Sequence, residues 1–166
     1  MLRKFLSHPK PESTMDHTKC RVLLFSGDGL ISKLIKWQTR SIFSHVGVLT
    51  DDGKVLEAIE GSGVRIRDWA EEDKRNTVQF TVDGLGQEGW EKTIAFMKAQ
   101  IGKKYDWWAI IRFVSRRYMP DNDHWFCSEL VFTAVREGGV HLLRRIRPSE
   151  VSPGGLSTSP LLRSAE

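Results

Sequence analysis

The N-terminal part of the chain alternates short apolar runs with polar turns. Residues 20–25 are mostly apolar and rich in branched side chains, which is typical of a buried strand. Residues 26–29 contain two glycines and predict a turn. Apolar side chains then recur at helical spacing over residues 30–37, with Asp28 as the expected N-cap. The pattern predicts a strand followed by a helix.

Two apolar runs flank an Asp-Asp-Gly sequence and predict a β-hairpin. The runs cover residues 44–49 and 54–59, and an Asp-Gly pair between such runs is a strong hairpin signal. Residues 64–67 and 78–82 alternate apolar and polar side chains, as strands with one solvated face do. We therefore expect the sheet to grow by antiparallel addition.

The apolar spacing becomes helical in the second half of the chain. A helix is expected from Gln87 to a stop at Gly102, with Trp90, Ile94, Met97 and Ile101 on one face. Residues 106–114 predict another helix, and residues 120–123 predict a loop. The helix that follows this loop carries Cys127 and ends at two glycines, Gly138 and Gly139. The sequence thus predicts an α+β fold in which an antiparallel sheet packs against helices.

The composition is that of one folded domain with a polar N-terminal extension. Residues 1–19 are polar and lack periodicity, so we expect a mobile tail before a single domain at residues 20–162. The segment from Pro148 is rich in Ser, Pro and Gly and is expected to wrap the surface. Hydrophobic residues make up 40% of the chain and charged residues 28%, which excludes a largely disordered protein.

Charge and cysteine content argue against several functional classes. The net charge of +4 is small and no nucleic-acid motif accompanies the basic clusters, so no nucleic-acid partner is expected. Two cysteines are too few for a disulfide scaffold and favour a reducing compartment. No apolar stretch has the length of a signal-peptide core or of a membrane span. We expect a cytoplasmic protein without an integral membrane segment.

Cys127 is the candidate nucleophile. It stands at the predicted start of a helix, where unsatisfied backbone N–H groups and the positive end of the helix dipole favour a thiolate. The same backbone groups would stabilise the oxyanion that forms when a carbonyl is attacked. The alternative is a small buried hydrophobe, because free cysteine is among the most buried residue types. A base within reach would favour the catalytic interpretation.

His45 is the best-placed base, because it opens a firmly predicted strand of the hairpin. With a three-residue loop at residues 51–53, Glu57 lies opposite Gly47 and projects on the same face as His45. With a two-residue loop, Glu60 lies opposite His45 instead. Either acid could orient the imidazole, and the alternative for both is an exposed strand carboxylate.

The order of these residues resembles that of a known family. A histidine in residues 44–48, an acid twelve residues after it, and a cysteine in residues 126–130 are similar to the permuted papain-like hydrolases of the YiiX/YebB type. They also resemble the related lecithin retinol acyltransferase-like proteins. The similarity extends to residues 25–29, 102–107 and 152–156.

The resemblance implies a permuted papain-like fold and a role for each site residue. Cys127 would attack a carbonyl, His45 would take and return the proton, and Glu57 would orient His45. The acyltransferase relatives carry histidine at the position of Glu57, so the resemblance favours Glu57 over Glu60. It also places Tyr105 and Asp106 near the site. Tryptophans near the site, Trp125 among them, are candidates to line a substrate cleft, or else belong to the core.

The resulting functional prediction is a thiol hydrolase without a cofactor. Its substrate would be an amide, ester or thioester, with the family pointing to peptidoglycan peptides or lipid-linked acyl groups. Two alternatives use the same fold: an acyltransferase with the same Cys/His site, and a catalytically silent binding module. A zinc site built from Cys127, His124 and another histidine is a competing reading, but the compact ligand pairs of zinc fingers are missing from the sequence.

Overall fold

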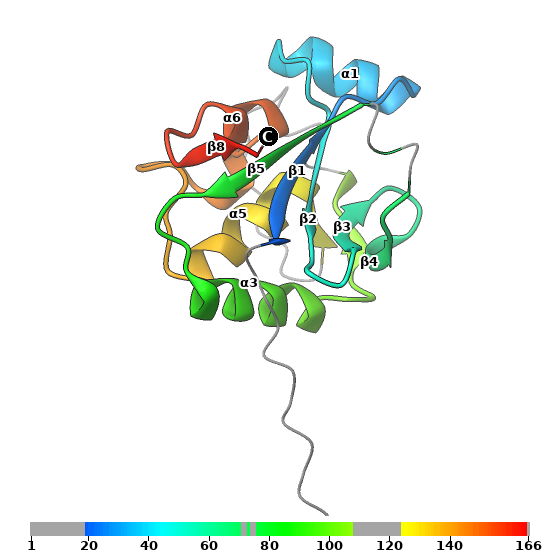
Figure 1. Ribbon diagram of the computed structural model, residues 1–166. Helices are drawn as coiled ribbons and strands as arrows, with labels where there is room; N and C mark the ends of the chain where they lie inside the picture. The colour runs from blue at the N-terminus through cyan, green and yellow to red at the C-terminus, as the bar shows by residue number, and fades with distance from the viewer. Residues whose placement is uncertain (1–18, 71–72, 74–75, 108–123, 166) are drawn as a thin grey trace, which may run out of the picture.

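A six-stranded antiparallel sheet organises the residues that the computed structural model describes, which are 19–70, 73, 76–107 and 124–165. Its strands lie in the order β4-β3-β2-β1-β5-β8, and every neighbouring pair is antiparallel (Figure 1). The strands are β1 (Arg21–Phe25), β2 (His45–Leu49), β3 (Lys54–Ile59), β4 (Gly63–Asp68), β5 (Thr77–Val82) and β8 (Leu162–Ser164). The predicted antiparallel sheet is therefore confirmed.

Helices supply the second layer. The α-helices of the described residues are α1 (Leu30–Thr39), α3 (Gln87–Ala99), α5 (Cys127–Glu137) and α6 (Pro153–Ser157), and a 3-10 turn, η2, spans Pro148–Glu150. Helix α5 packs against β2, β3 and α3, and its residues from Leu130 to Val135 are buried. Because α5 is enclosed on several sides, it is apolar over most of its surface. The prediction of a sheet packed against the Cys127 helix is confirmed.

A short second sheet leads into α5. Its strands β6 (Lys104–Tyr105) and β7 (His124–Trp125) run parallel, with Tyr105 opposite Trp125. This pairing brings the 102–107 segment next to the residues that precede Cys127. The predicted loop at 120–123 and most of the predicted 106–114 helix lie outside the described residues. No helix within the described ranges is long and apolar enough to cross a bilayer.

The C-terminal segment does not wrap the surface, so that prediction is wrong. It contributes η2, α6 and the sheet strand β8, and Val151 and Leu156 are fully buried. Ser152 caps α6 by accepting a hydrogen bond from the Gly155 backbone N–H at 2.9 Å. Apolar burial and this cap give the Gly-rich sequence a helical turn that its composition alone does not favour.

The expected N-cap of α1 is also wrong. Gly29 occupies the N-cap position, and its neighbour Asp28 forms an ion pair with Lys36 at 3.6 Å instead. The carboxylate therefore bridges to the next turns of the helix and does not accept a backbone N–H at its start.

Candidate active site

The β2–β3 hairpin has the register of a three-residue loop. Gly47 lies directly opposite Glu57. Gly53 closes the loop with a φ of +75°, a left-handed conformation that glycine adopts without strain. The register predicted for a loop at residues 51–53 is confirmed, and it puts the side chains of Glu57 and His45 on the same face of the sheet.

Gly47 keeps the space beside the Glu57 carboxylate open. A Cβ at this position would lie 3.1 Å from the Leu56 carbonyl oxygen and from Cγ1 of Val55, and 3.4 Å from Cβ of Glu57. The Leu56 oxygen belongs to the backbone and Cγ1 of Val55 to a branched side chain of the paired strand, so neither atom can move far to accommodate a Cβ. A larger residue would therefore press on the strand that carries Glu57.

His45 and Glu57 form a direct hydrogen bond. The Nε2 atom of His45 lies 3.0 Å from Oε2 of Glu57, whose side chain is only 1% exposed. The His45 ring also packs against Phe25, with ring centroids 5.2 Å apart. Because the carboxylate accepts the Nε2–H proton, Nδ1 is the ring nitrogen left to exchange a proton with another group. The hairpin thus fixes both the orientation and the tautomer of the imidazole.

Two arginines bind the other oxygen of Glu57. Oε1 accepts hydrogen bonds from Arg65 through Nε at 3.0 Å and Nη2 at 2.8 Å, and from Arg67 through Nε at 2.9 Å. Arg67 is held in turn by Asp73, with Nη2 and Oδ1 3.1 Å apart. Sequence reasoning missed this network, although the polar positions of β4 are opposite and diagonal to Glu57 in the antiparallel register.

The arginines and the histidine together keep Glu57 ionised. Burial alone would raise the pKa of Glu57, but hydrogen bonds and charge interactions with His45, Arg67 and Arg65 outweigh it and hold the pKa well below its usual range. Hydrogen bonds and charge interactions with Asp73 and Glu57 raise the pKa of Arg67, despite the opposing effect of burial. Glu57 is therefore a permanent negative charge behind His45 at neutral pH.

Cys127 is the first residue of α5 and interacts with the His45 imidazole. Burial disfavours the imidazolium, but hydrogen bonds with Cys127 and Glu57 outweigh that effect and raise the pKa of His45 to about 10. Phe126, the N-cap of α5, supplies no side-chain hydrogen bond to the first turn. The structure thus brings Cys127, His45 and Glu57 together from α5, β2 and β3.

A cavity of about 240 Å³, here called the His45 cavity, opens beside this group. Its lining includes His45, Glu57, Glu60, Arg67 and Tyr105, and on the α1 side Ile31, Ser32 and Ile35. Glu60 reaches the cavity, but the hydrogen bond to His45 is made by Glu57. Cys127 is fully buried and is not among the lining residues.

The three candidate substrate-binding residues lie in different environments. Tyr105 lines the His45 cavity and packs against Phe126, with ring centroids 5.8 Å apart. Asp106 is buried, and its backbone N–H donates to the Trp125 carbonyl at 3.1 Å. Trp125 packs edge-on against Phe96 of α3 and lies outside the lining of the cavity.

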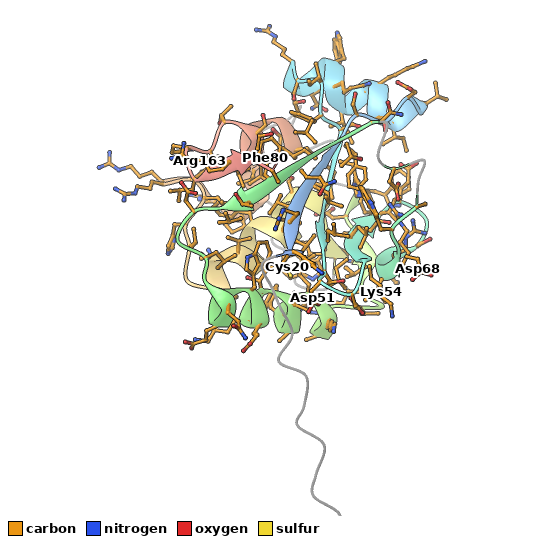
Figure 2. The ribbon with its side chains drawn as sticks, viewed as in Figure 1. Cys20, Asp51, Lys54, Asp68, Phe80 and Arg163 are labelled. Atoms are coloured by element: carbon orange, nitrogen blue, oxygen red, sulfur yellow. The ribbon has the colours of Figure 1, made fainter. Side chains whose placement is uncertain are left out.

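The second cysteine, Cys20, lies at the opposite end of the sheet from His45. It precedes β1, whose first residue is paired with the last residue of β2. Figure 2 shows Cys20 close to the hairpin loop at Asp51 and Lys54. Burial raises the pKa of the Cys20 thiol to about 11. Cys20 is thus a neutral core thiol, remote from the imidazole.

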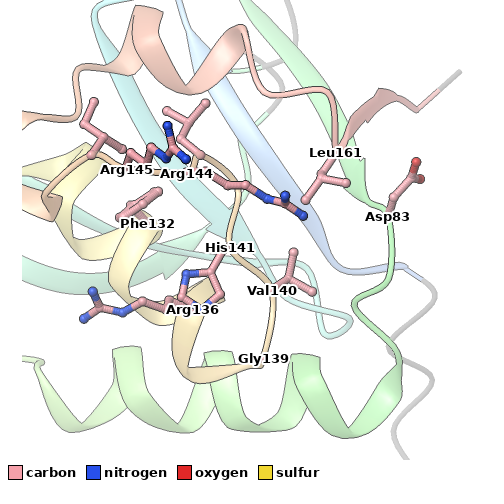
Figure 3. A pocket seen from close by; sticks show the side chains of 11 residues that line it. Asp83, Phe132, Arg136, Gly139, Val140, His141, Arg144, Arg145 and Leu161 are labelled. Atoms are coloured by element: carbon pink, nitrogen blue, oxygen red, sulfur yellow. The ribbon is translucent and has the colours of Figure 1, made fainter.

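A larger cavity, of about 480 Å³, lies beyond the C-terminal end of α5 (Figure 3). Arg136, Arg144, Arg145 and His141 contribute to its wall, together with apolar side chains such as Phe132 and Leu161. It shares no lining residue with the His45 cavity, so the two cavities are distinct.

The described residues contain no cluster of three or more His, Cys, Asp and Glu side chains suited to a metal ion. His124, the zinc-ligand candidate, lies in β7 and lines a third cavity together with Tyr105 and Trp107. Glu57 is also unsuited to a cation, because its Oε1 already accepts three N–H groups from two positively charged arginines.

Comparison with solved structures identifies the fold. The metalloprotein YiiX from Escherichia coli O157:H7 matches with a TM-score of 0.67 over 88% of this chain and 94% of its own, at 20% sequence identity. No protein-family model and no curated protein matches this sequence. The chain therefore has the α+β fold of YiiX, with the six-stranded antiparallel sheet that carries His45 and Glu57.

Proposed function

We propose that this protein is a cysteine hydrolase that cleaves an amide, ester or thioester through an acyl-cysteine intermediate. One observation carries the proposal: His45 is hydrogen-bonded to the buried Glu57 carboxylate at 3.0 Å and interacts with Cys127 at the start of α5, so the three residues meet from three different elements. A thiol, a base and a group that orients the base are the three parts that thiol catalysis requires. The YiiX fold supports the proposal only as far as the architecture.

The first half of the reaction forms the acyl-enzyme. His45, whose raised pKa favours the imidazolium, holds the proton of the Cys127 thiol at Nδ1 as the sulfur forms a bond to the substrate carbonyl carbon. Negative charge develops on the carbonyl oxygen, where backbone N–H groups at the start of α5 provide stabilisation. The bond from carbon to the leaving group then breaks, and the leaving amine, alcohol or thiol receives its proton from the His45 imidazolium.

Water completes the cycle. His45 takes a proton from a water molecule, whose oxygen attacks the acyl carbon and displaces the sulfur. The displaced sulfur shares the proton that the His45 imidazolium now carries, which restores the starting Cys127–His45 pair and leaves a carboxylic acid as the product, so no external oxidant or reductant is needed. Throughout both halves, the Glu57 carboxylate stabilises the imidazolium and holds the ring in place.

Access to the sulfur requires a local movement. Cys127 has no exposed surface, whereas His45 lines the cavity. A substrate carbonyl that enters the His45 cavity must therefore open a path beside the imidazole before attack. Displacements of this kind are common where catalysis depends on closure around a substrate.

A metal has no role in this mechanism. YiiX is described as a metalloprotein, but the donor set here does not fit one, because the two oxygens of Glu57 are bound by His45 and by two cationic side chains. Replacing these contacts by a metal ion would leave two guanidinium groups next to a cation.

Alkylation of the two cysteines tests the proposal. Iodoacetamide should modify Cys127 faster than Cys20 near pH 7, and His45→Ala should slow only the modification of Cys127. The site of modification is read by peptide mapping. Equal, His45-independent rates for both thiols would overturn the nucleophile assignment.

A second measurement detects the acyl-enzyme directly. Incubation with p-nitrophenyl acetate should add one acetyl group to Cys127, visible by intact mass and peptide mapping, and Cys127→Ala should abolish it. Adding an amine in competition with water then distinguishes hydrolysis from acyl transfer. Acetylation that persists in Cys127→Ala would contradict the mechanism.

A further inference from the structure

Helix α1 exposes a group of large apolar side chains, here called the α1 apolar face. Leu30 is 87% exposed, Trp37 76%, Leu34 45% and the following Ile42 68%. Leu30, Leu34 and Trp37 are spaced four and three residues apart, so they share one side of the helix. Four of the eight large apolar side chains exposed among the described residues lie within residues 30–42.

This arrangement is unusual for a helix at a protein surface. The outward side of such a helix normally carries charged and polar residues, and only its inward side is apolar. In α1 the inward side is apolar as well, because Ile35 is buried in the core. Exposed apolar side chains gathered in one place mark a surface that contacts another apolar phase.

The charges around the α1 apolar face are positive. Lys33 and Arg40 are exposed beside it, and α1 contains no acidic residue. The nearby Asp28 is paired with Lys36. An apolar stripe with tryptophan and flanking basic residues is the pattern of helices that lie in the interface of a lipid bilayer.

The inward side of α1 borders the candidate site. Ile31, Ser32 and Ile35 line the His45 cavity, while Leu30, Leu34 and Trp37 point outward. One helix therefore separates the cavity from the exposed apolar surface. In Figure 1, α1 stands at one end of the molecule and α3 at the opposite end, so the face can approach a flat surface without obstruction by α3.

We propose that the α1 apolar face docks on an anionic lipid bilayer, from which an acyl-bearing lipid enters the His45 cavity along α1. The choice of lipid as substrate rests on the proposed hydrolase function; docking does not depend on catalysis. A second copy of this chain is a poorer occupant, because a symmetric contact would bring Lys33 and Arg40 of each copy toward those of the other.

Vesicle co-sedimentation of the full chain tests the docking. The probes are phosphatidylcholine vesicles and equimolar phosphatidylcholine–phosphatidylglycerol vesicles, and we expect stronger binding to the second. Leu30→Ser with Trp37→Ser should lower the partition coefficient by about tenfold or more, since each change removes a large buried apolar side chain from the lipid. The matched control is Ile101→Ser, an exposed apolar residue that follows α3 and should leave binding unchanged.

Charge reversal separates the electrostatic contribution. Lys33→Glu with Arg40→Glu should lower binding to the anionic vesicles by about tenfold or more at low salt, and have little effect on the neutral ones. Lys98→Glu, at the last turn of α3, is the matched control. Circular dichroism of each variant verifies that the fold is retained.

Two results would overturn the docking proposal. One is a chain that does not bind anionic vesicles, or binds them equally well after the Leu30 and Trp37 changes. The other is a dimer in light scattering that these changes dissociate while vesicle binding is absent. Running the assay on Cys127→Ala separates docking from catalysis: a variant that binds vesicles as the parent does supports docking even if no hydrolysis is found with the parent.

Discussion

The two cysteines of this chain are both buried, yet their surroundings differ. Cys20 precedes β1 at the hairpin-loop end of the sheet, where burial raises the pKa of its thiol to about 11. Cys127 begins α5 and interacts with the His45 imidazole, which is hydrogen-bonded to the buried Glu57 carboxylate. Burial by itself keeps a thiol neutral and inert. What distinguishes Cys127 is therefore the ionisable group beside it.

The largest expected effect tests this difference through activity. Cys127→Ala should reduce hydrolysis of an activated ester by about 10³-fold or more, because it removes the nucleophile. Cys20→Ala should leave the rate within about twofold of the parent. Steady-state rates on p-nitrophenyl esters provide the measurement. A comparable loss in both variants would mean that Cys127 acts only through stability.

The acid behind His45 provides the next test. Glu57→Gln should lower the turnover rate roughly 10²-fold, because an amide stabilises the imidazolium less well than a carboxylate. It should also lower the free energy of unfolding by about 2 kcal/mol, less than for a fully buried ion pair because Arg65 and Arg67 retain solvent contact.

Glu60→Gln is the matched control for Glu57→Gln, because Glu60 lines the same cavity without the hydrogen bond to His45. It should keep most of the activity and stability of the parent. If Glu60→Gln were the more damaging change, Glu60 and not Glu57 would be the residue that orients His45.

The smallest expected effect is the pH dependence of the free energy of unfolding. The pKa of His45 is raised from 6.5 to about 10 on folding, so its contribution to stability is complete below pH 6.5 and is lost as the pH rises toward 10. The pKa of Cys20 is raised from 9.0 to about 11, and because its neutral form is the favoured one in the fold, stability falls only as the pH rises above 9.0.

The two pH windows can be separated by urea denaturation. In the parent, the free energy of unfolding should decline between pH 7 and pH 9, and His45→Gln should remove that part of the decline. Cys20→Ala should keep the decline between pH 7 and pH 9 and should reduce the pH dependence of the free energy of unfolding only above pH 9. An unchanged slope in His45→Gln would contradict the coupling of His45 to Cys127 and Glu57.

Local signals in the sequence were sufficient for the geometry of the hairpin. The Asp-Gly loop and the alternation of apolar residues determine which side chains share a face, because the side-chain period of a strand is two. Given the loop length, the proximity of His45 and Glu57 follows. The start of a helix at Cys127 could also be predicted from the sequence, because the helical spacing of apolar residues begins there.

Contacts between segments that are distant in the sequence could not be predicted from local patterns. Residues 64–67 predict a strand with a solvated polar face, but Arg65 and Arg67 turn toward the buried Glu57. A strand with a solvated polar face and a strand whose polar side chains bind a buried carboxylate show the same alternation of apolar and polar residues. Only the charge of the residue on the neighbouring strand distinguishes the two. Likewise, the Gly-rich sequence of α6 by itself predicts a loop. The helical turn depends on the burial of Leu156 and on the Ser152 cap, which only the structure shows.

The two arginines on Glu57 also constrain what can stand at position 57. Both arginines donate to the same carboxylate oxygen, so they favour a negatively charged residue at this position. In this chain an imidazole at position 57 would face two guanidinium groups, of which only Arg67 would keep a carboxylate partner, Asp73, so the imidazole would be held neutral or expelled. Exchanging the third residue of the site therefore demands simultaneous replacement of Arg65 and Arg67. In a comparison of many such chains, the residue types at 57, 65 and 67 should vary together.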